Sequence, residues 1–254
     1  MMTVPWFMEE IDERGVARLT LTRADEHNRL SAQLILELSA ALNGLAHDER
    51  VRVLVLAARG TTFCAGADLQ EMLFSGKGDR KENLDDARAF SELMHDLSVF
   101  PKPVVGVVQG NVYGGGLGLV ACCDIAVCAE GVSFQLSEVR LGLIPAVIAP
   151  YVINRIGPGH FRCKALLGEA FDAREAFGLG LVHKLVPYED LRSATGRVLE
   201  SLLRGGPQAQ TRIKQLNENL SSAETARLLA DIRTSGEAQE GMQAFRDRQE
   251  PDWS

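Results

Sequence analysis

Strand-like hydrophobic patterns dominate the first half of the chain. Val16–Thr22 alternates apolar and polar residues, which predicts a strand with one buried face. Three more stretches are almost wholly apolar, which predicts strands covered on both faces: Val51–Ala57, Pro103–Gln109 and Asp124–Ala129. Ser31 precedes apolar residues at helical spacing, so we expect it to cap a helix between the first two strands.

Polar and helical patterns separate and follow these strands. Ser75–Asp86 carries glycines and charges, so we expect a surface loop there, followed by a helix over Ala87–Phe100. Beyond about residue 145, only Leu181–Val186 has an extended pattern. The remaining periodic stretches predict helices: Ile144–Ile156, Phe161–Leu167, Ala173–Phe177, Leu191–Leu203, Gln208–Leu220, Ala223–Thr234 and Glu237–Arg248. We therefore expect a β/α core followed by a helical region.

Composition and charge narrow the class of protein. The 254 residues are 46% hydrophobic and 24% charged, as in ordinary globular domains, and a net charge of −7 argues against a broad nucleic-acid surface. No apolar run is long enough for a membrane span, and the early acidic residues of Met1–Glu13 argue against a secretory signal. The five cysteines form no C-x-x-C pair, which indicates reduced thiols in a cytoplasmic protein, and no histidine is placed to make one catalytic.

Two glycine-bearing loops are the first candidates for chemistry. Phe63–Leu69 and Gln109–Gly118 each follow a buried strand and open a helix. Glycines let the backbone approach a ligand closely, and the free N–H groups at a helix N-terminus favour negative charge. Two such loops side by side could direct two donors at one developing oxyanion. For either loop alone, tight packing of a helix on a strand is the simpler alternative.

Other chemistries fit these residues less well. Gly114–Gly118 lacks both the Gly-Lys-Ser/Thr of a phosphate-binding loop and the spacing of a dinucleotide fingerprint. A G-x-S-x-G nucleophile motif is absent from the sequence. We expect no metal site, because no ligand spacing relates the histidines: His27, His47, His95, His160 and His183.

Four segments together resemble the enoyl-CoA hydratase/isomerase (crotonase) superfamily. Phe63–Leu69, FCAGADL, is similar to the family's first signature, and Gln109–Asp124, QGNVYGGGLGLVACCD, is similar to its second. Ser137–Pro145, SEVRLGLIP, is similar to the third, and Glu240–Trp253 resembles the family's C-terminal sequence. Their order and spacing agree over nearly the whole chain.

The resemblance implies an α/β fold in which a spiral of ββα turns precedes a helical trimerisation region. Residues 1–195 would form the spiral core with the acyl-CoA site, and residues 196–254 the trimerisation region. Family members usually form trimers or dimers of trimers, so we expect a homotrimer or hexamer. The ligand would be an acyl-CoA thioester, whose coenzyme A is part of the substrate, so we expect no separate cofactor and no nucleic-acid or membrane partner.

The resemblance also implies the residues of the site. The oxyanion donors would be the backbone N–H groups of Ala67 and Gly115. Asp68 would help to open its helix, although an ordinary acid favoured by the helix dipole explains it equally well. The coenzyme A contacts would come from His27, Ala65, Ala67, Asp68, Leu69, Phe245 and Arg248. A neighbouring subunit often supplies the last two, and a plain surface histidine is the alternative for His27.

The acid/base residues depart from the pattern of simple hydratases, in which two glutamates flank the double bond. The first position here is Gly118 and the second is Glu138, whose alternative role is to order its own loop. We expect Gly118 to free volume and remove a like charge, which would suit an anionic acyl chain. With Leu141–Pro150, this pattern is similar to bacterial methylglutaconyl-CoA and isohexenylglutaconyl-CoA hydratases, and to dehydratases of 3-hydroxy-3-methylglutaryl thioesters.

Three functions remain open on these grounds. The first is a hydratase, reversible as a dehydratase, that acts on a branched, methylglutaconyl-like CoA ester with Glu138 as acid/base. The second is a Δ3–Δ2 enoyl-CoA isomerase that uses Glu138 alone. The third is a CoA-ester-binding or RNA-binding protein without catalysis, and the acidic charge argues against RNA.

Overall fold

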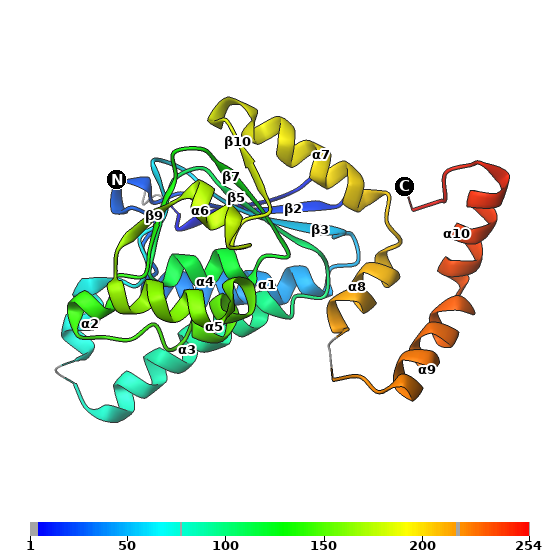
Figure 1. Ribbon diagram of the computed structural model, residues 1–254. Helices are drawn as coiled ribbons and strands as arrows, with labels where there is room; N and C mark the ends of the chain where they lie inside the picture. Colours follow the sequence, from blue (N-terminus) through cyan, green and yellow to red (C-terminus); the bar gives the residue numbers. More distant parts are fainter. Residues whose placement is uncertain (1–4, 77, 217–218, 254) are drawn as a thin grey trace.

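The computed structural model describes residues 5–76, 78–216 and 219–253 (Figure 1). Within these residues a six-stranded sheet has the order β1-β2-β3-β5-β7-β10. Only the pairing of β1 with β2 is antiparallel; the other neighbours in this sheet are parallel. The bounds of its strands are β1 Phe7–Ile11, β2 Val16–Leu21, β3 Val53–Ala58, β5 Val104–Val108, β7 Ile125–Ala129 and β10 Lys184–Val186.

The predicted strands are confirmed, and the edge strand is an addition. In β2, Ala17, Leu19 and Leu21 are fully buried, as the alternation predicts. β1 was not predicted, because its sequence FMEEI exposes Glu9 and Glu10 and lacks a buried run. A strand at a sheet edge pairs on one side only and often carries charged residues, so its hydrophobic pattern predicts a strand less clearly.

A second sheet lies within segments that the sequence analysis did not predict as strands. Its described strands have the order β4-β6-β8-β9. Each has three residues: β4 Thr62–Cys64, β6 Asn111–Tyr113, β8 Ser133–Gln135 and β9 Ala170–Asp172. β4 and β6 pair in parallel, so the two glycine-bearing turns that follow them leave the sheet side by side.

The helices cover and extend this framework. Those of the body are α1 Ala32–His47, α2 Leu69–Ser75, α3 Arg80–Ser98, α4 Gly115–Cys122, α5 Ala149–Leu167 and α6 Ala173–Gly178, with 3-10 turns η1 Ala24–Glu26, η2 Glu138–Leu141 and η3 Tyr188–Asp190. Ser31 caps α1 by accepting from the Leu34 N–H at 3.2 Å, as predicted. Across residues 5–76, 78–216 and 219–253, no helix is long and apolar enough to cross a membrane.

Two predictions for these helices are wrong. The predicted loop Ser75–Asp86 is mostly helix, because the Asp79 carboxylate accepts from the first N–H groups of α3 and starts that helix at Arg80; residue 77 lies outside the described residues. The predicted start of the helix Ile144–Ile156 is also wrong, because α5 begins at Ala149. The prediction of two helical segments, Ile144–Ile156 and Phe161–Leu167, is otherwise confirmed, since Gly157 has a non-helical φ of 77° and divides α5 in two.

The C-terminal helices leave the body as an arm (Figure 1). α7 Leu191–Leu203 packs on the six-stranded sheet, and the arm comprises α8 Pro207–Gln215, α9 Ser222–Arg233 and α10 Gly236–Asp247. The predicted helix Gln208–Leu220 ends earlier, at Gln215, and residues 217–218 lie outside the described residues. The boundary between residues 195 and 196 falls inside α7, and the division into two domains stays a prediction.

A single arginine holds the two ends of the arm. Arg52 Nη1 donates to the carbonyl oxygen of Trp253 at 2.7 Å. Its Nη2 donates to the carbonyl oxygens of Leu203 at 3.2 Å and Gly205 at 3.0 Å. The Trp253 indole also donates to the Arg204 carbonyl oxygen at 3.2 Å. The start and the end of the arm are therefore fixed to the same point beside β3.

Candidate active site

The two glycine-bearing turns touch at the N-termini of α2 and α4. Gly66 has a φ of 82°, a conformation that favours glycine. A Cβ added to Gly66 would lie 2.9 Å from the Tyr113 carbonyl oxygen and 3.1 Å from the Gly115 nitrogen. The turn that carries Ala67 is therefore packed directly against the turn that carries Gly115.

The N–H groups of Ala67 and Gly115 are both left free by the local pairing. The Leu30 N–H donates to the Gly66 carbonyl oxygen at 2.8 Å, and the Leu30 carbonyl oxygen accepts from the Asp68 N–H at 3.2 Å. These two hydrogen bonds use the residues on either side of Ala67 and leave the Ala67 N–H without a partner in this pairing. Gly115 is the first residue of α4, where N–H groups have no acceptor within the helix. Neither N–H has a protein acceptor among the described residues. Two free donors in adjoining turns can stabilise one developing negative charge, and the role of these two amides in catalysis stays a prediction.

Asp68 fixes the first of these turns. Its side chain is 4% exposed, and Oδ1 accepts from the N–H groups of Gln70 at 2.8 Å and Glu71 at 3.3 Å. Arg29 donates to Oδ2. Burial raises the pKa of Asp68, but the Arg29 guanidinium and the two amides outweigh it, and the pKa is lowered overall. An ionised, fully engaged carboxylate positions the turn and is unsuited to transferring protons.

Glu138 has the opposite environment. It begins η2, and a Cβ added to Gly114 would lie 3.0 Å from its Oε1, so the carboxylate lies against the turn before Gly115. Its Oε2 is buried and has no hydrogen-bond partner among the described residues. Burial raises the pKa of Glu138 above the usual range of a glutamate. A partly buried carboxylate with free lone pairs and a raised pKa is suited to general acid–base catalysis.

Replacing Glu138 by Gln should change stability in a pH-dependent way. Since the folded-state pKa is raised, the native protein binds more protons than the unfolded chain between the ordinary and the raised pKa. Wild-type stability should therefore fall as pH rises through that window. Glu138→Gln should melt at a higher temperature than wild type at neutral pH, and the gain should shrink in acid. Thermal unfolding of both proteins across this range measures it; a gain that does not depend on pH would contradict the assignment.

The wall around the two turns is apolar. A Cβ added to Gly118 would lie 2.3 Å from Ile148 Cγ2 and 2.9 Å from Met94 Sδ. A Cβ added to Gly115 would lie 2.8 Å from Phe90 Cζ, and Leu30 Cδ1 would be 3.1 Å away. The expectation that Gly118 frees volume for an acyl chain is wrong, because Ile148 and Met94 fill that space.

The residues predicted to contact coenzyme A fall into two groups. His27 is exposed, and its Nδ1 lies 3.0 Å from Thr62 Oγ1, while the Ala65 N–H donates to the His27 carbonyl oxygen at 3.0 Å. Leu69, 47% exposed, opens α2 beside them. Phe245 and Arg248 lie on the arm, far from α2 in Figure 1, so one chain does not bring the two groups together. Their roles in binding stay predictions.

The cysteine nearest to this site is not a nucleophile. Cys64 is fully buried at the end of β4, and burial raises the pKa of its thiol to about 12. Its Sγ accepts from the Gly66 N–H at 3.4 Å, so it supports the turn. A thiol that stays protonated at neutral pH cannot attack a thioester efficiently.

The whole chain is similar to proteins of one enzyme family. The family model described as "Enoyl-CoA hydratase/isomerase" matches residues 12–254. The chain therefore belongs to the enoyl-CoA hydratase/isomerase family of enzymes, and its α/β architecture is the crotonase fold.

Solved structures and curated relatives agree with this membership. An enoyl-CoA hydratase from Shewanella pealeana is 38% identical with a TM-score of 0.92, and covers 98% of this chain and 96% of its own. AtuE of Pseudomonas aeruginosa is 35% identical with a TM-score of 0.93, and covers 98% and 99%. The 4-chlorobenzoyl coenzyme A dehalogenase-2 of an Arthrobacter species is 30% identical over 82% of this chain and 76% of its own. Proteins about 30–38% identical to this chain therefore include both a hydratase and a dehalogenase, so the similarity alone does not fix the reaction.

Proposed function

We propose that this protein is an acyl-CoA hydratase, reversible as a dehydratase, that acts on a branched, methylglutaconyl-like enoyl-CoA. The observation that carries the proposal is the partly buried Glu138 carboxylate, whose Oε2 has no partner among the described residues and whose Oε1 lies against Gly114, the residue before Gly115. The similarity of Gly118, Glu138 and Leu141–Pro150 to methylglutaconyl-type hydratases supports the choice of substrate. Ile148 belongs to the segment Leu141–Pro150 and fills the space beside Gly118. The glycine at position 118 and the isoleucine at position 148 are therefore sterically matched to each other.

One carboxylate is sufficient for this reaction. The thioester oxygen would accept from the N–H groups of Ala67 and Gly115, which stabilise the charge of the enolate. Glu138 takes a proton from water as the water oxygen bonds to the β-carbon, and the electron pair of the double bond moves into the enolate. The Glu138 carboxylic acid then returns that proton to the α-carbon. The elements of water are added across the double bond, and the carboxylate is restored.

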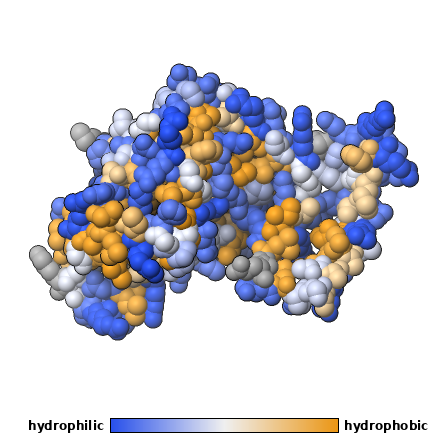
Figure 2. Space-filling model, viewed as in Figure 1, coloured by the Kyte–Doolittle hydropathy of each residue, from blue (hydrophilic) through white to orange (hydrophobic). Residues whose placement is uncertain are grey.

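The coenzyme A site would be completed by a second copy of the chain. His27, Ala65 and Leu69 surround the turn of Ala67, whereas Phe245 and Arg248 lie on the arm. Figure 2 shows apolar surface over this arm, where the exposed apolar residues are Ile213, Leu216, Leu229, Met242 and Phe245. Exposed apolar surface of this kind favours association between subunits. A homotrimer or a dimer of trimers, with each arm reaching a neighbour, accounts for both observations.

Isomerisation of a Δ3 to a Δ2 double bond is the second candidate. The apolar wall formed by Ile148, Met94 and Phe90 favours it, because none of these side chains can hold a water molecule for attack. Incubation with methylglutaconyl-CoA and with 3-hexenoyl-CoA, followed by analysis of the thioester products, separates the two. A 3-hydroxy product from the first ester supports hydration, and 2-hexenoyl-CoA from the second supports isomerisation. Binding without turnover of either ester would refute both and favour a non-catalytic protein.

Restoring an acid at position 118 should destabilise the protein. Gly118→Glu places a Cβ 2.3 Å from Ile148 Cγ2 and buries an unpaired carboxylate, so we expect a loss of about 3 kcal/mol or more in the free energy of unfolding. Removing the obstructing side chain in Gly118→Glu/Ile148→Gly should recover part of this loss. Urea unfolding measures both effects. The control is Gly159→Glu on α5, where an added Cβ has no neighbour within 4 Å and the variant should unfold like wild type.

A further inference from the structure

A hollow lies on the opposite side of the sheet from the turns of Ala67 and Gly115, between α7 and β2. Its volume is about 510 Å³, and its lining includes Val107 of β5 together with Leu191 and Leu199 of α7. Arginines from two different elements, Arg18 of β2 and Arg192 of α7, also line it. Ala67, Gly115 and Glu138 do not contribute to it, so this cavity is separate from the proposed acyl-CoA site.

The two arginines have no acidic partner. A third arginine of the lining, Arg14, forms an ion pair with Asp12 at 2.7 Å. Among the described residues, no carboxylate lies within 4.0 Å of the guanidinium groups of Arg18 or Arg192, and neither group makes a hydrogen bond. Glu189 belongs to the same lining, Glu10 lies opposite Arg18 in the β1–β2 pairing, and Glu130 lines the adjoining cavity and pairs with Arg174 at 3.8 Å. Both guanidinium groups therefore keep their donors available in a chain of net charge −7.

The position of Arg18 makes this unusual. Its neighbours Ala17 and Leu19 are fully buried on the core face, and the alternation of β2 turns the half-buried Arg18 to the face that α7 covers. A guanidinium that is partly removed from water loses hydration, and anionic oxygens restore its hydrogen bonds more strongly than neutral acceptors do. An anion in this cavity would satisfy Arg18 and Arg192 together.

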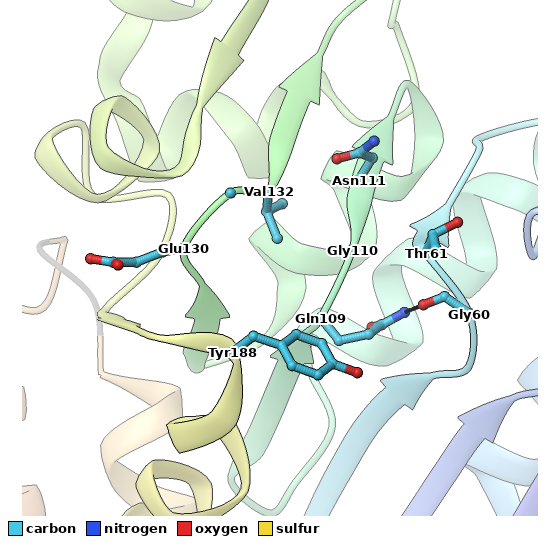
Figure 3. A pocket seen from close by; sticks show the side chains of 9 residues that line it. Gly60, Thr61, Gln109, Gly110, Asn111, Glu130, Val132 and Tyr188 are labelled. Carbon is cyan, nitrogen blue, oxygen red and sulfur yellow. Dashed lines mark hydrogen bonds between the residues drawn. The ribbon is translucent and has the colours of Figure 1, made fainter.

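A neighbouring hollow extends the same surface. It has a volume of about 470 Å³, and Tyr188 lines both cavities. Figure 3 shows Gln109 in this second hollow, with its Nε2 donating to the Gly60 carbonyl oxygen at 3.0 Å. Gln109 Oε1 is buried and has no donor among the described residues. A ligand with a hydroxyl or similar donor beyond Tyr188 would supply one.

We propose that these adjoining cavities form a binding site for a small polyanion that also carries a hydrogen-bond donor. Its anionic oxygens would bind Arg18 and Arg192, and its donor would reach Gln109. The shared chemistry is that of a phosphate or a polycarboxylate, because planar guanidinium groups match both. This site is independent of the acyl-CoA chemistry, so its test does not depend on turnover.

Isothermal titration of the full-length protein at constant ionic strength tests the site. The probes are citrate and pyrophosphate, titrated without coenzyme A, and the dependence on Arg18 and Arg192 separates this site from phosphate contacts of the proposed acyl-CoA site. Wild type should bind at least one: citrate alone identifies a polycarboxylate site, and pyrophosphate alone identifies a phosphate site. Arg18→Gln and Arg192→Gln should each weaken binding roughly tenfold, since each removes charge-assisted hydrogen bonds.

The matched control is Arg197→Gln. Arg197 lies on α7 like Arg192 and is exposed, but it does not line the cavity. Its loss should leave the dissociation constant unchanged. Because Arg192 is exposed on the helix surface, its replacement should not affect folding, which thermal unfolding verifies. Failure of wild type to bind either probe, or equal binding by Arg192→Gln and Arg197→Gln, would overturn the proposal.

Discussion

Glu138→Gln should lower the turnover of the enoyl-CoA substrate by about 10²–10⁴-fold, the usual contribution of a general acid–base residue. The amide has nearly the shape of the carboxylate but cannot accept a proton from water or return one to the α-carbon. The dissociation constant of the CoA ester should change little, because the predicted coenzyme A contacts lie on other residues. A loss confined to kcat would therefore identify Glu138 as the acid/base.

The pH profile gives an independent check of this assignment. Glu138 must be ionised to act as a base, so wild-type kcat/KM should rise with pH through its raised pKa. This acidic limb should be absent from the residual activity of Glu138→Gln. Glu169→Gln is the control, because Glu169 is exposed and lies ahead of β9. Full activity of Glu138→Gln would remove this residue from the mechanism.

Gly66→Ala should lose at least about 10²-fold in turnover, because it separates the two donors of the enolate oxygen. The added Cβ would lie 2.9 Å from the Tyr113 carbonyl oxygen and 3.1 Å from the Gly115 nitrogen, both of them backbone atoms that cannot rotate away. The turns must move apart, and misplacing a preorganised donor by up to about 1 Å is enough to cost about 10²-fold in rate.

A second glycine separates this effect from ordinary backbone strain. Gly131 has a φ of 85°, close to the 82° of Gly66, but a Cβ there has no neighbour within 4 Å. Gly131→Ala and Gly66→Ala should both lose about 1 kcal/mol from the unfavourable φ. Only Gly66→Ala should lose turnover. Kinetic assays and urea unfolding of both variants test this; equal turnover would show that the contact of the two turns is unimportant for catalysis.

The large sheet was predictable because each of its inner strands carries a local pattern. β2 shows alternation, while β3, β5 and β7 are apolar runs long enough to recognise. The strands of the second sheet have three residues each, which leaves no room for a period. They are held in place by neighbours that are distant in the chain, such as β6 beside β4, and only the folded structure reveals those pairings.

The candidate site was predictable only as far as its motifs extend. The segments of Ala67, Gly115 and Glu138 are each marked by local sequence, and the structure brings them together. Met94 and Ile148 were not predicted, because each looks like an ordinary core residue in its own helical segment. Their importance follows from contact with Gly118, which depends on how α3 and the start of α5 pack against α4. The expectation that Gly118 frees volume was wrong because this packing joins segments that are distant in the sequence.

The hydrogen bonds from Arg52 to the carbonyl oxygens of Leu203, Gly205 and Trp253 affect how subunits would associate. Both ends of the arm are fastened within one subunit, so the direction of the arm is decided before any neighbour arrives. A preorganised extension loses little conformational freedom when it docks. Exchange of the whole arm between copies would first require the Trp253 carbonyl oxygen to leave this guanidinium, which makes domain-swapped assembly unfavourable.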